Sequence, residues 1–361
     1  MNRRDMLKST LLASGALATA GFPAVAAAQK TFNWKMTTTW PAGTPFYQSG
    51  PGGAEAFAKR VEVMSGGRLK IQVYAAGELV PAFEGFDACS AGIVEMNHGV
   101  SYYWAGKTAA AQYFATVPFG MSFQGHHAWL YHGGGLELWR EVYKPFNVVP
   151  MSAGCSGVQM VGWFKNPVGD IKDFNGLKMR IPGLAGRIYA ELGVDVKLLP
   201  GGEIFPALER GVIDAAEWVG PFLDRRLGLQ NAAKHYYTTG WHEPSTTSEI
   251  IISEGAWNSL PEDLKAIVQA AAAATNQEGL LFLEAMNGPA LADMVENFGV
   301  QTAELPADVT ERLREVSRDV LNDYASKDAL VKKVHDSFFA FKEKHDAWGQ
   351  ISETTFQTTV R

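Results

Sequence analysis

The chain has 361 residues, with 32 basic and 38 acidic side chains and a formal net charge of −6 at neutral pH. Its lysines and arginines are scattered and form no basic stripe, which argues against a nucleic-acid-binding surface. The length exceeds what one ordinary hydrophobic core accommodates, so we expect two domains.

Residues 1–28 have the pattern of a cleavable export signal. A basic start containing Arg3 and Arg4 precedes a mildly apolar stretch, and small residues gather at 26–28. The paired arginines favour the twin-arginine route, on which a protein is exported after folding, and an ordinary secretory signal is the alternative. We expect cleavage after Ala28. No later stretch reaches the roughly 18 consecutive apolar residues of a membrane span, so we expect no membrane insertion.

The region after the signal begins with alternating strands and helices. Residues 31–37 and 69–74 alternate in polarity with the period of a strand, and the segment 54–64 between them is predicted as a helix. Residues 83–91 are predicted to be helical and 94–98 to form a short strand. A strand, a helix and a strand in close succession indicate a βαβ unit of an α/β domain.

A second cycle of strands and helices begins near Gly157. Its strands are predicted at 158–164, 178–181, 195–199 and 213–218, and its helices at 185–192 and 203–210. Cycles on both sides of a mid-chain junction suit two α/β lobes with a cleft between them. Small ligands bind preferentially at such domain interfaces.

The C-terminal part is predicted to be mostly helical. Helical patterns run from Pro261 to Val295, and two long polar-faced helices follow at 308–325 and 329–348. An apolar stripe at roughly helical spacing is formed by Phe338, Phe339, Phe341 and Trp348. We therefore divide the chain after the signal into lobe I at 29–156 with part of 246–290, lobe II at 157–245 with part of 290–330, and a C-terminal helix at 330–361.

An arginine at the end of a predicted strand is the first candidate binding residue. Residues 176–183 read Gly-Leu-Lys-Met-Arg-Ile-Pro-Gly, and the Pro-Gly pair holds Arg180 on rigid backbone at a cleft edge. A guanidinium there can grip a carboxylate with two parallel hydrogen bonds. A salt-bridged surface arginine is the alternative, and the spacing alone leaves it open.

Two further segments combine glycines with polar side chains. In 200–218 a helix ends at a glycine and a strand then delivers Glu217 and Trp218 side by side, while 156–160 reads Ser-Gly-Val-Gln-Met. The glycines suggest phosphate binding, but no G-x-G-x-x-G follows a strand and opens a helix. The glycine run at 133–135 is interpreted as a loop or a helix start.

Other reactive side chains do not form a catalytic pattern. Cys89 and Cys155 could pair in an oxidising compartment, but two buried free thiols are the preferred interpretation. His126, His127 and His132 have no Cys or acidic partner at ligand spacing nearby, which favours a capping or core role. The absence of a nucleophile elbow, an H-E-x-x-H motif and a nucleotide fingerprint argues against an enzyme.

At these segments the chain resembles the solute receptors of TRAP (tripartite ATP-independent periplasmic) transporters, the DctP family, over essentially all of the region after the signal. Within that family it is most similar to the TakP-like receptors for 2-oxo and 2-hydroxy monocarboxylates such as pyruvate and lactate. This closer match is carried by residues 75–81, 131–135, 157–160 with 162–164, and 217–221, whereas 177–183 and 202–217 match the wider family.

The resemblance implies a two-lobed α/β fold of the periplasmic-binding-protein type and a metal-assisted binding site. Arg180 corresponds to the arginine that fixes the ligand carboxylate. A metal ion bridging protein and ligand would be held by Gln159, Glu217 and the backbone carbonyl of Trp218, with Glu243 as a weaker candidate. These oxygen ligands suit sodium or calcium rather than zinc. A 2-oxo acid would chelate this ion through a carboxylate oxygen and its oxo oxygen.

The same resemblance indicates residues around the ligand. Tyr102, Tyr103 and Phe46 are candidate pocket walls, with ordinary core packing as the alternative. Cys155, beside the ligand, stands with Ser156 where close relatives tend to have Asn-Thr, and a serine replaces a glycine before the tyrosines. These departures predict an acid that differs from pyruvate or is bulkier.

Location and partners are also implied. The resemblance indicates a periplasmic receptor that delivers a small carboxylate to TRAP membrane permease subunits after lobe closure, and a homodimer made by an exchanged C-terminal helix. Packing of that helix against the chain's own lobe is the alternative to the dimer. The rival functional class is an exported metal-dependent enzyme acting on a small carboxylic acid.

Overall fold

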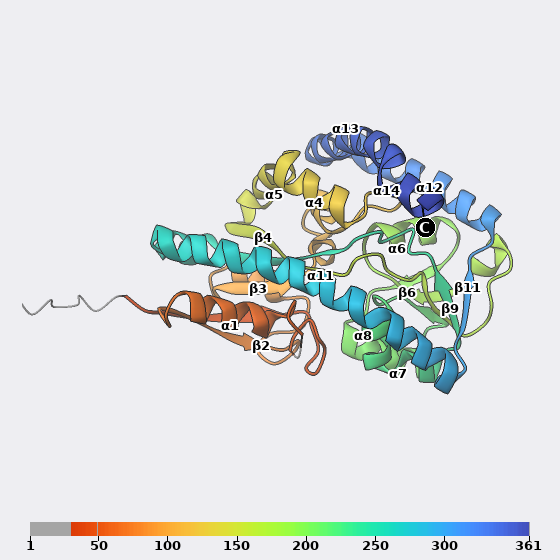
Figure 1. Cartoon of the computed structure of the whole chain (residues 1–361), viewed down its shortest axis with the longest axis horizontal. Coiled ribbons are helices and arrows are strands. Elements are labelled where there is room, and N and C mark those ends of the chain that lie inside the picture. Colours follow the sequence, from red (N-terminus) through yellow and green to blue (C-terminus); the bar gives the residue numbers. More distant parts are fainter. Residues whose placement is uncertain (1–29, 49, 361) are drawn as a thin grey trace, which may run out of the picture. The chain divides into compact units, whose positions relative to one another are not determined.

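The computed structural model describes residues 30–48 and 50–360, so the export signal predicted at 1–28 lies outside the described residues. From Phe32 onwards the described chain groups into one unit that contains two mixed sheets (Figure 1). The predicted α/β class and the long C-terminal helices are therefore confirmed. The boundaries of the two lobes stay predictions. No helix in the described part of the chain has the length and apolar character needed to cross a membrane.

The first sheet has five strands. Its strand order is β2 (Leu69–Tyr74), β1 (Phe32–Thr38), β3 (Met96–Gly99), β10 (Thr247–Ser253) and β4 (Val148–Cys155). β1 pairs in parallel with β2 and β3, whereas β10 runs antiparallel to both β3 and β4. The chain thus returns from its second half to complete this sheet. Neither β4 nor β10 is predicted from the sequence, because both are buried almost throughout and do not alternate in polarity.

The second sheet has six short strands. Its order is β11 (Gln301–Glu304), β9 (His235–Thr238), β5 (Gly162–Phe164), β8 (Ala215–Ala216), β6 (Lys178–Arg180) and β7 (Asp195–Lys197). β6 pairs in parallel with β7 and β8, and β5 is antiparallel to β8 and β9. The strand predicted at 158–164 is confirmed only over its last three residues, which leaves Gln159 in a loop.

Helices cover both sheets (Figure 1). Those before the second sheet are α1 (Ala54–Met64), α2 (Gly85–Ser90), α3 (Gln112–Ala115), α4 (Phe123–His132) and α5 (Gly135–Tyr143). Those that follow are α6 (Gly183–Glu191), α7 (Gly201–Glu209), α8 (Pro221–Leu227), α9 (Leu229–Ala232), α10 (Glu254–Ser259), α11 (Glu262–Phe298), α12 (Ala307–Lys327), α13 (Ala329–Ile351) and α14 (Glu353–Thr355). Gly134 has φ 87° and precedes α5, so the glycine run at 133–135 is a helix start as predicted.

Helix α11 links the two halves of this unit. It packs against β4 and α1 beside the five-stranded sheet and against α8 beside the six-stranded sheet, and Figure 1 shows it running past both. Helix α1 shows why such helices dock: its buried residues Ala54, Phe57, Ala58 and Val61 recur at the spacing of one helical face.

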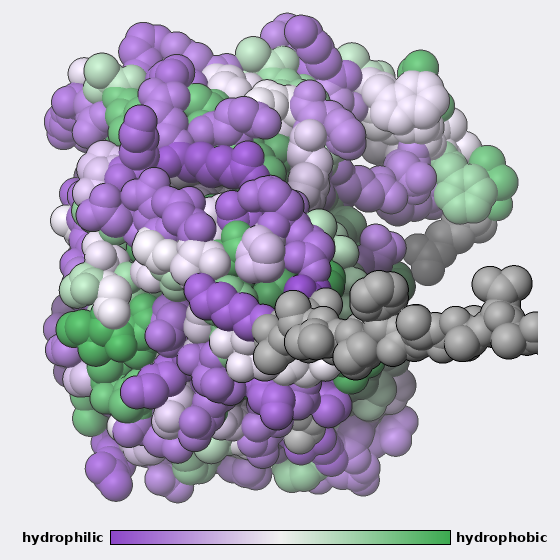
Figure 2. All heavy atoms as spheres, turned by 90° about the vertical axis from the view of Figure 1, so that its left-hand side faces the viewer, coloured by the Kyte–Doolittle hydropathy of each residue, from purple (hydrophilic) through white to green (hydrophobic). Residues whose placement is uncertain are grey.

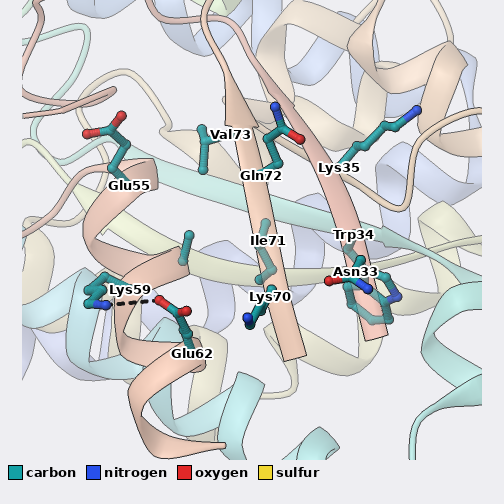
Figure 3. A pocket seen from close by; sticks show the side chains of 11 residues that line it. Asn33, Trp34, Lys35, Glu55, Lys59, Glu62, Lys70, Ile71, Gln72 and Val73 are labelled. Atoms are coloured by element: carbon teal, nitrogen blue, oxygen red, sulfur yellow. Dashed lines mark hydrogen bonds and ion pairs between the residues drawn. The ribbon is translucent and has the colours of Figure 1, made fainter. Parts of the chain in front are cut away.

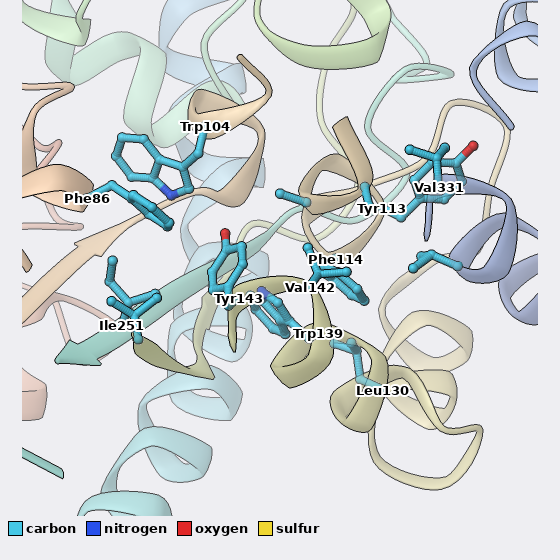
Figure 4. Packing of buried hydrophobic residues seen from close by; sticks show 14 of the residues in the cluster. Phe86, Trp104, Tyr113, Phe114, Leu130, Trp139, Val142, Tyr143, Ile251 and Val331 are labelled. Atoms are coloured by element: carbon cyan, nitrogen blue, oxygen red, sulfur yellow. The ribbon is translucent and has the colours of Figure 1, made fainter. Parts of the chain in front are cut away.

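The aromatic core beside the five-stranded sheet also receives the C-terminal helix α13. In Figure 4, Phe86, Trp104 and Tyr143 face one another, with ring centroids of Phe86 lying 5.3 Å from each of the other two. Phe338 is completely buried in this cluster, 5.1 Å from Trp129 between ring centroids. The first part of the predicted apolar stripe thus packs on its own chain.

Candidate ligand and metal site

Three chain segments that are distant in sequence are tied together by backbone hydrogen bonds. In the loop before β5, Gln159 N donates to Glu243 O at 3.1 Å and Met160 N donates to Val219 O at 3.0 Å. A Cβ atom on Gly240 would lie 2.1 Å from the Gln159 carbonyl oxygen, so only glycine allows this approach. The backbone thereby brings the predicted metal ligands of all three segments to one place.

Arg180 ends β6 and is 1% exposed. Its Nη1 donates to the backbone oxygen of Glu217 at 2.7 Å and to Glu217 Oε2 at 3.1 Å, and its Nε donates to Leu199 O at 3.2 Å. The alternative of a surface arginine is therefore wrong. Nη2 has no hydrogen-bond partner among the described residues, so one arm of the guanidinium is available to a ligand.

Glu217 and Gln159 also carry buried oxygens without partners. Within the described residues, Glu217 Oε1 and Gln159 Oε1 accept no hydrogen bond, although the Gln159 amide nitrogen donates to Ser156 Oγ at 3.1 Å. Both side chains are almost completely buried. An unsatisfied buried acceptor costs about 1–3 kcal/mol, so these two oxygens are suited to accept a hydrogen bond or to bind a cation.

Glu217, His242 and Glu243 form a cluster in which one ligand atom of each lies within 4.8 Å of the others. Burial and the charge of Glu243 raise the pKa of Glu217 well above its ordinary value, against the attraction of Arg180. Burial also raises the pKa of Glu243 to about 7, and the Thr246 hydroxyl donates to that carboxyl group. The positive charge of Arg180 thus does not offset the effect of burial at either glutamate.

His242 is the member of this cluster that the sequence analysis missed. It is completely buried, neither ring nitrogen has a partner in the described part of the chain, and burial lowers its pKa to about 3. The only signal available was its position directly before Glu243 in Gly-Trp-His-Glu.

The oxygen ligands gathered here suit a hard cation. Gln159 and Glu217 each have a free side-chain oxygen, Glu243 adds a carboxylate, and Trp218 follows Glu217 on the same loop. Oxygen-only sets of amide, carboxylate and carbonyl groups are typical of calcium and sodium sites, so the residues present fit the cation that the sequence predicts.

A cavity of about 270 Å³ adjoins these groups. It is lined by Trp40, Phe46, Val100, Tyr102, Tyr103, Ser156, Gln159, Trp218, Val219, Thr246 and Ser248. All three predicted wall aromatics are among these residues. Most of the wall is apolar or aromatic, as is typical of sites for small ligands.

Cys155 does not line this cavity. It ends β4 with its Sγ 3.2 Å from Ser245 Oγ, and its neighbour Ser156 is the residue that lines the wall. Cys89 and Cys155 are free, buried thiols, as preferred from the sequence, and burial raises the pKa of Cys155 to about 11. His127 is buried and contacts Ser152 Oγ at 3.2 Å, which is the predicted core role.

A second small cavity, of about 190 Å³, lies on the other side of Tyr102. Its wall includes Gln112, Thr116, Gly183, His242 and Glu243. The unpartnered hydroxyl of Thr116 and ring nitrogens of His242 make this wall more polar than that of the first cavity.

Asp224 of α8 fixes the loop that carries the metal-site candidates. Its carboxylate accepts hydrogen bonds from Trp163 Nε1 at 2.9 Å, Tyr236 Oη at 2.8 Å and Val219 N at 3.0 Å. Burial raises the pKa of Asp224 to about 6 although these donors oppose the shift. The loop after Trp218 is thereby anchored to the six-stranded sheet.

A larger hollow of about 990 Å³ lies elsewhere, between α1 and strands β1 and β2 (Figure 3). Its wall is largely made of polar side chains, including the ion pair between Lys59 and Glu62 at 2.9 Å. None of the predicted site residues lies there. Hydrophilic side chains also predominate on the face of the molecule that Figure 2 shows, with apolar groups in separate patches.

Comparison with known sequences gives one family and several relatives. The profile of the bacterial extracellular solute-binding proteins, family 7 (DctP), matches residues 36–328. A monocarboxylate 2-oxoacid-binding periplasmic protein of Nostoc is 41% identical over 362 residues, which covers 99% of this chain and 98% of that relative. A sialic acid-binding periplasmic protein of Vibrio cholerae is 24% identical over 66% of this chain and 72% of its own length.

Solved structures of TRAP solute-binding proteins share the fold. The protein from Colwellia psychrerythraea, with bound calcium and pyruvate, is 38% identical with a TM-score of 0.86 and covers 91% of this chain and 99% of its own. The protein from Pseudoalteromonas atlantica, with sodium and pyruvate, is 35% identical with a TM-score of 0.87 and the same coverage. The protein from Bordetella bronchiseptica, a mixed-occupancy dimer with calcium and picolinate, is 34% identical with a TM-score of 0.88, covering 92% and 97%.

Proposed function

Since this chain belongs to family 7 of the bacterial extracellular solute-binding proteins, the receptors of TRAP transporters, we propose that it captures a small 2-oxo or 2-hydroxy monocarboxylate and delivers it to membrane permease subunits. The family resemblance predicted from the sequence is confirmed. The chain is accordingly a binding receptor and not an enzyme, so the rival class of an exported enzyme is set aside.

The observation that carries this proposal is a set of buried polar atoms without partners beside one cavity. Arg180 Nη2, Glu217 Oε1 and Gln159 Oε1 all lack a hydrogen-bond partner within the described chain. A carboxylate would satisfy the guanidinium, and a cation would satisfy the two oxygens. The pyruvate complexes of the Colwellia and Pseudoalteromonas relatives support this class of ligand.

Each residue has a separate task in the proposed site. Arg180 keeps Nη1 on Glu217 and donates from Nη2 to the ligand carboxylate, while Gln159, Glu217, the Trp218 carbonyl and Glu243 hold the ion. A bound cation would supply positive charge beside the second oxygen of the acid, which favours 2-oxo and 2-hydroxy acids over plain fatty acids.

The walls of the cavity support lobe closure as the mechanism of capture. Trp40 and Tyr102 follow strands of the five-stranded sheet, whereas Gln159 and Trp218 belong to loops of the six-stranded sheet. A ligand held between both sets of residues gives the closed state contacts that an open state lacks. That difference in affinity shifts the population towards the closed receptor.

We also propose that the protein acts in the periplasm after export through its N-terminal signal, by the twin-arginine route. The basic start with Arg3 and Arg4 supports export, and relatives of Nostoc and Vibrio cholerae are periplasmic proteins by name. A fusion of residues 1–28 to a reporter that is exported only when folded tests the route. Replacement of both arginines by lysine should abolish export of that reporter, and unchanged export contradicts the twin-arginine route.

A homodimer through the C-terminal helix is a further part of the proposal. Trp348 and Ile351 lie on one face of α13 and are 63% and 74% exposed, which leaves an apolar surface for a second copy. We expect Trp348→Glu with Ile351→Glu to convert a dimer to a monomer in light scattering, while Gln350→Glu, exposed on another face of the same helix, leaves the dimer intact. A monomeric wild-type protein contradicts this part.

A thermal-shift screen tests the ligand class. We expect 2-oxo and 2-hydroxy monocarboxylates to raise the melting temperature of the purified protein, and a chelator to abolish that rise because the ion holds the second ligand oxygen. Propionate and butyrate serve as matched acids without that oxygen. Stabilisation that is equal for propionate and pyruvate and insensitive to the chelator would reject the proposed site.

A further inference from the structure

The buried site contains more negative than positive charge. Arg180 contributes one guanidinium, while Glu217 and Glu243 contribute two carboxylates. Arg180 forms its ion pair with Glu217 at 3.1 Å, and Glu243 has no ion pair in the described part of the chain. The group that donates to Glu243 is the neutral hydroxyl of Thr246, so its charge remains uncompensated.

Neighbouring groups do not correct this imbalance. His242 is a completely buried imidazole, and neither of its nitrogens has a hydrogen-bond partner among residues 30–48 and 50–360, an environment that disfavours its charged form. Asp224 lies close enough for its carboxylate to act on Glu217 and adds further negative charge. No lysine lines either of the two small cavities. With both glutamates deprotonated, as ligands of a cation must be, the protein therefore presents one excess negative charge in a fully buried place, before Asp224 is counted.

The ligand makes the imbalance larger. A monocarboxylate on Arg180 adds one negative charge, so the closed complex would carry two negative charges that the protein does not neutralise. A monovalent cation cancels one of them and a divalent cation cancels both. An unpaired buried charge is strongly unfavourable, which gives the divalent ion a clear advantage.

On the basis of the proposed function, we infer that this receptor selects calcium over sodium, and that Glu243 is the residue that sets this preference. Without Glu243, a monovalent ion would neutralise the complex as well as a divalent ion does with it. The second carboxylate of the cluster is thus a selectivity determinant for the cation and not only a spare ligand.

Calorimetric titration of the protein purified from the periplasm tests the preference. The protein is stripped with a chelator, kept in potassium buffer of constant ionic strength, and titrated with pyruvate in the presence of saturating calcium or sodium. We expect pyruvate to bind on the order of a hundredfold more tightly with calcium. Equal affinities, or tighter binding with sodium, overturn the inference without any variant being needed.

Glu243→Gln tests the residue. This variant keeps the size and one oxygen of the side chain but removes the charge, so we expect the advantage of calcium over sodium to fall towards equality. The matched control is Glu249→Gln, which makes the same replacement at a buried glutamate outside the cluster. A calcium preference that persists in Glu243→Gln, in protein with a native near-ultraviolet dichroism spectrum, contradicts the role of Glu243.

A titration with calcium alone separates this inference from the proposed function. Calcium binding that is selective over sodium, with no response to any 2-oxo acid, supports the cation preference and contradicts the proposed function. Pyruvate binding that is equally tight with calcium and with sodium supports the proposed function and contradicts the cation preference. Metal analysis of the protein as purified adds a second readout, and we expect calcium in it.

Discussion

Glu249 and Glu217 are both completely buried glutamates, one beneath the five-stranded sheet and one at the ligand site, but their surroundings differ. Both carboxyl oxygens of Glu249 accept hydrogen bonds, from the Trp104 indole and from the Tyr143 hydroxyl at 3.1 and 3.0 Å. Glu217 has one oxygen on Arg180 and leaves the other without a partner in the described chain.

The difference in hydrogen bonding distinguishes a carboxyl group that stabilises the fold from one that we propose binds a ligand. Burial raises the pKa of Glu249 to about 8, but its donors satisfy the group and join β10 to the aromatic core of Figure 4. Around Glu217 the described part of the chain supplies too few donors, which supports the proposal that a ligand completes the site. A buried polar group therefore indicates function mainly when its hydrogen-bonding capacity is incomplete.

The largest expected effect is that of Arg180→Gln. The change removes the ligand's partner and leaves Glu217 buried without its ion pair, so we expect pyruvate affinity to fall more than about a thousandfold and the free energy of unfolding to fall by about 3–5 kcal/mol. Calorimetry and urea denaturation measure the two losses. Arg187→Gln, on the exposed face of α6, is the control. Binding by Arg180→Gln close to that of the control contradicts the site.

The next largest effect is expected from Glu217→Gln. The amide keeps the shape of the side chain but removes a charge that holds the cation, so we expect calcium affinity to fall on the order of a hundredfold. Calorimetric titration with calcium measures this loss. The comparison with Glu249 fails if calcium binds as tightly to Glu217→Gln as to the wild type.

Glu249→Gln should lower the free energy of unfolding but leave ligand affinity unchanged. The amide nitrogen of the new glutamine must lie where the Trp104 indole or the Tyr143 hydroxyl donates a hydrogen bond. Donors that meet this nitrogen are left unpaired, which lowers the free energy of unfolding by about 1–3 kcal/mol. Affinity for calcium and pyruvate should stay at the wild-type level. Urea denaturation and the same titrations provide the check. Weakened ligand binding with unchanged stability would assign Glu249 to the site.

The smallest effect is a pH dependence of stability due to Glu249. Its folded pKa of about 8 lies above its ordinary value of 4.5, so the folded state binds the additional proton. The stabilisation of the folded state by this additional proton is complete below pH 4.5 and is lost as the pH rises through 8. We expect the difference in unfolding free energy between wild type and Glu249→Gln to fall by about 1 kcal/mol from pH 7 to 8. A constant difference contradicts it.

Much of the fold could be predicted from the sequence because local patterns determine it. Helix α1 and strand β2 have the predicted bounds, and α12 and α13 extend the predicted helices by a few residues. Their apolar positions follow the period of one face, which a single sequence displays. β4 and β10 were missed because they are buried on both sides, and the pairing of β10 with β3 and β4 joins segments about 100 residues or more apart.

The sequence predicts most residues of the candidate site but not how they are arranged. Arg180, Glu217 and Gln159 were named from their segments and from a family resemblance, and the structure places all three within one hydrogen-bonded region. The side chain of Cys155 instead faces Ser245, and His242 was overlooked. Side-chain direction at a strand end and the burial of one imidazole depend on neighbours that local sequence does not reveal.

The α/β class and the long C-terminal helices follow from the amino-acid sequence alone, because periodicity is a local property of the chain, and the residues proposed for a carboxylate and cation site follow from its resemblance to a family. Which of the buried polar atoms lack partners, and how their charges balance, depends on the folded chain. Hydrogen-bond satisfaction and charge neutrality depend on contacts between the loops before β5, after β8 and after β9, and those contacts exist only once the two sheets are assembled.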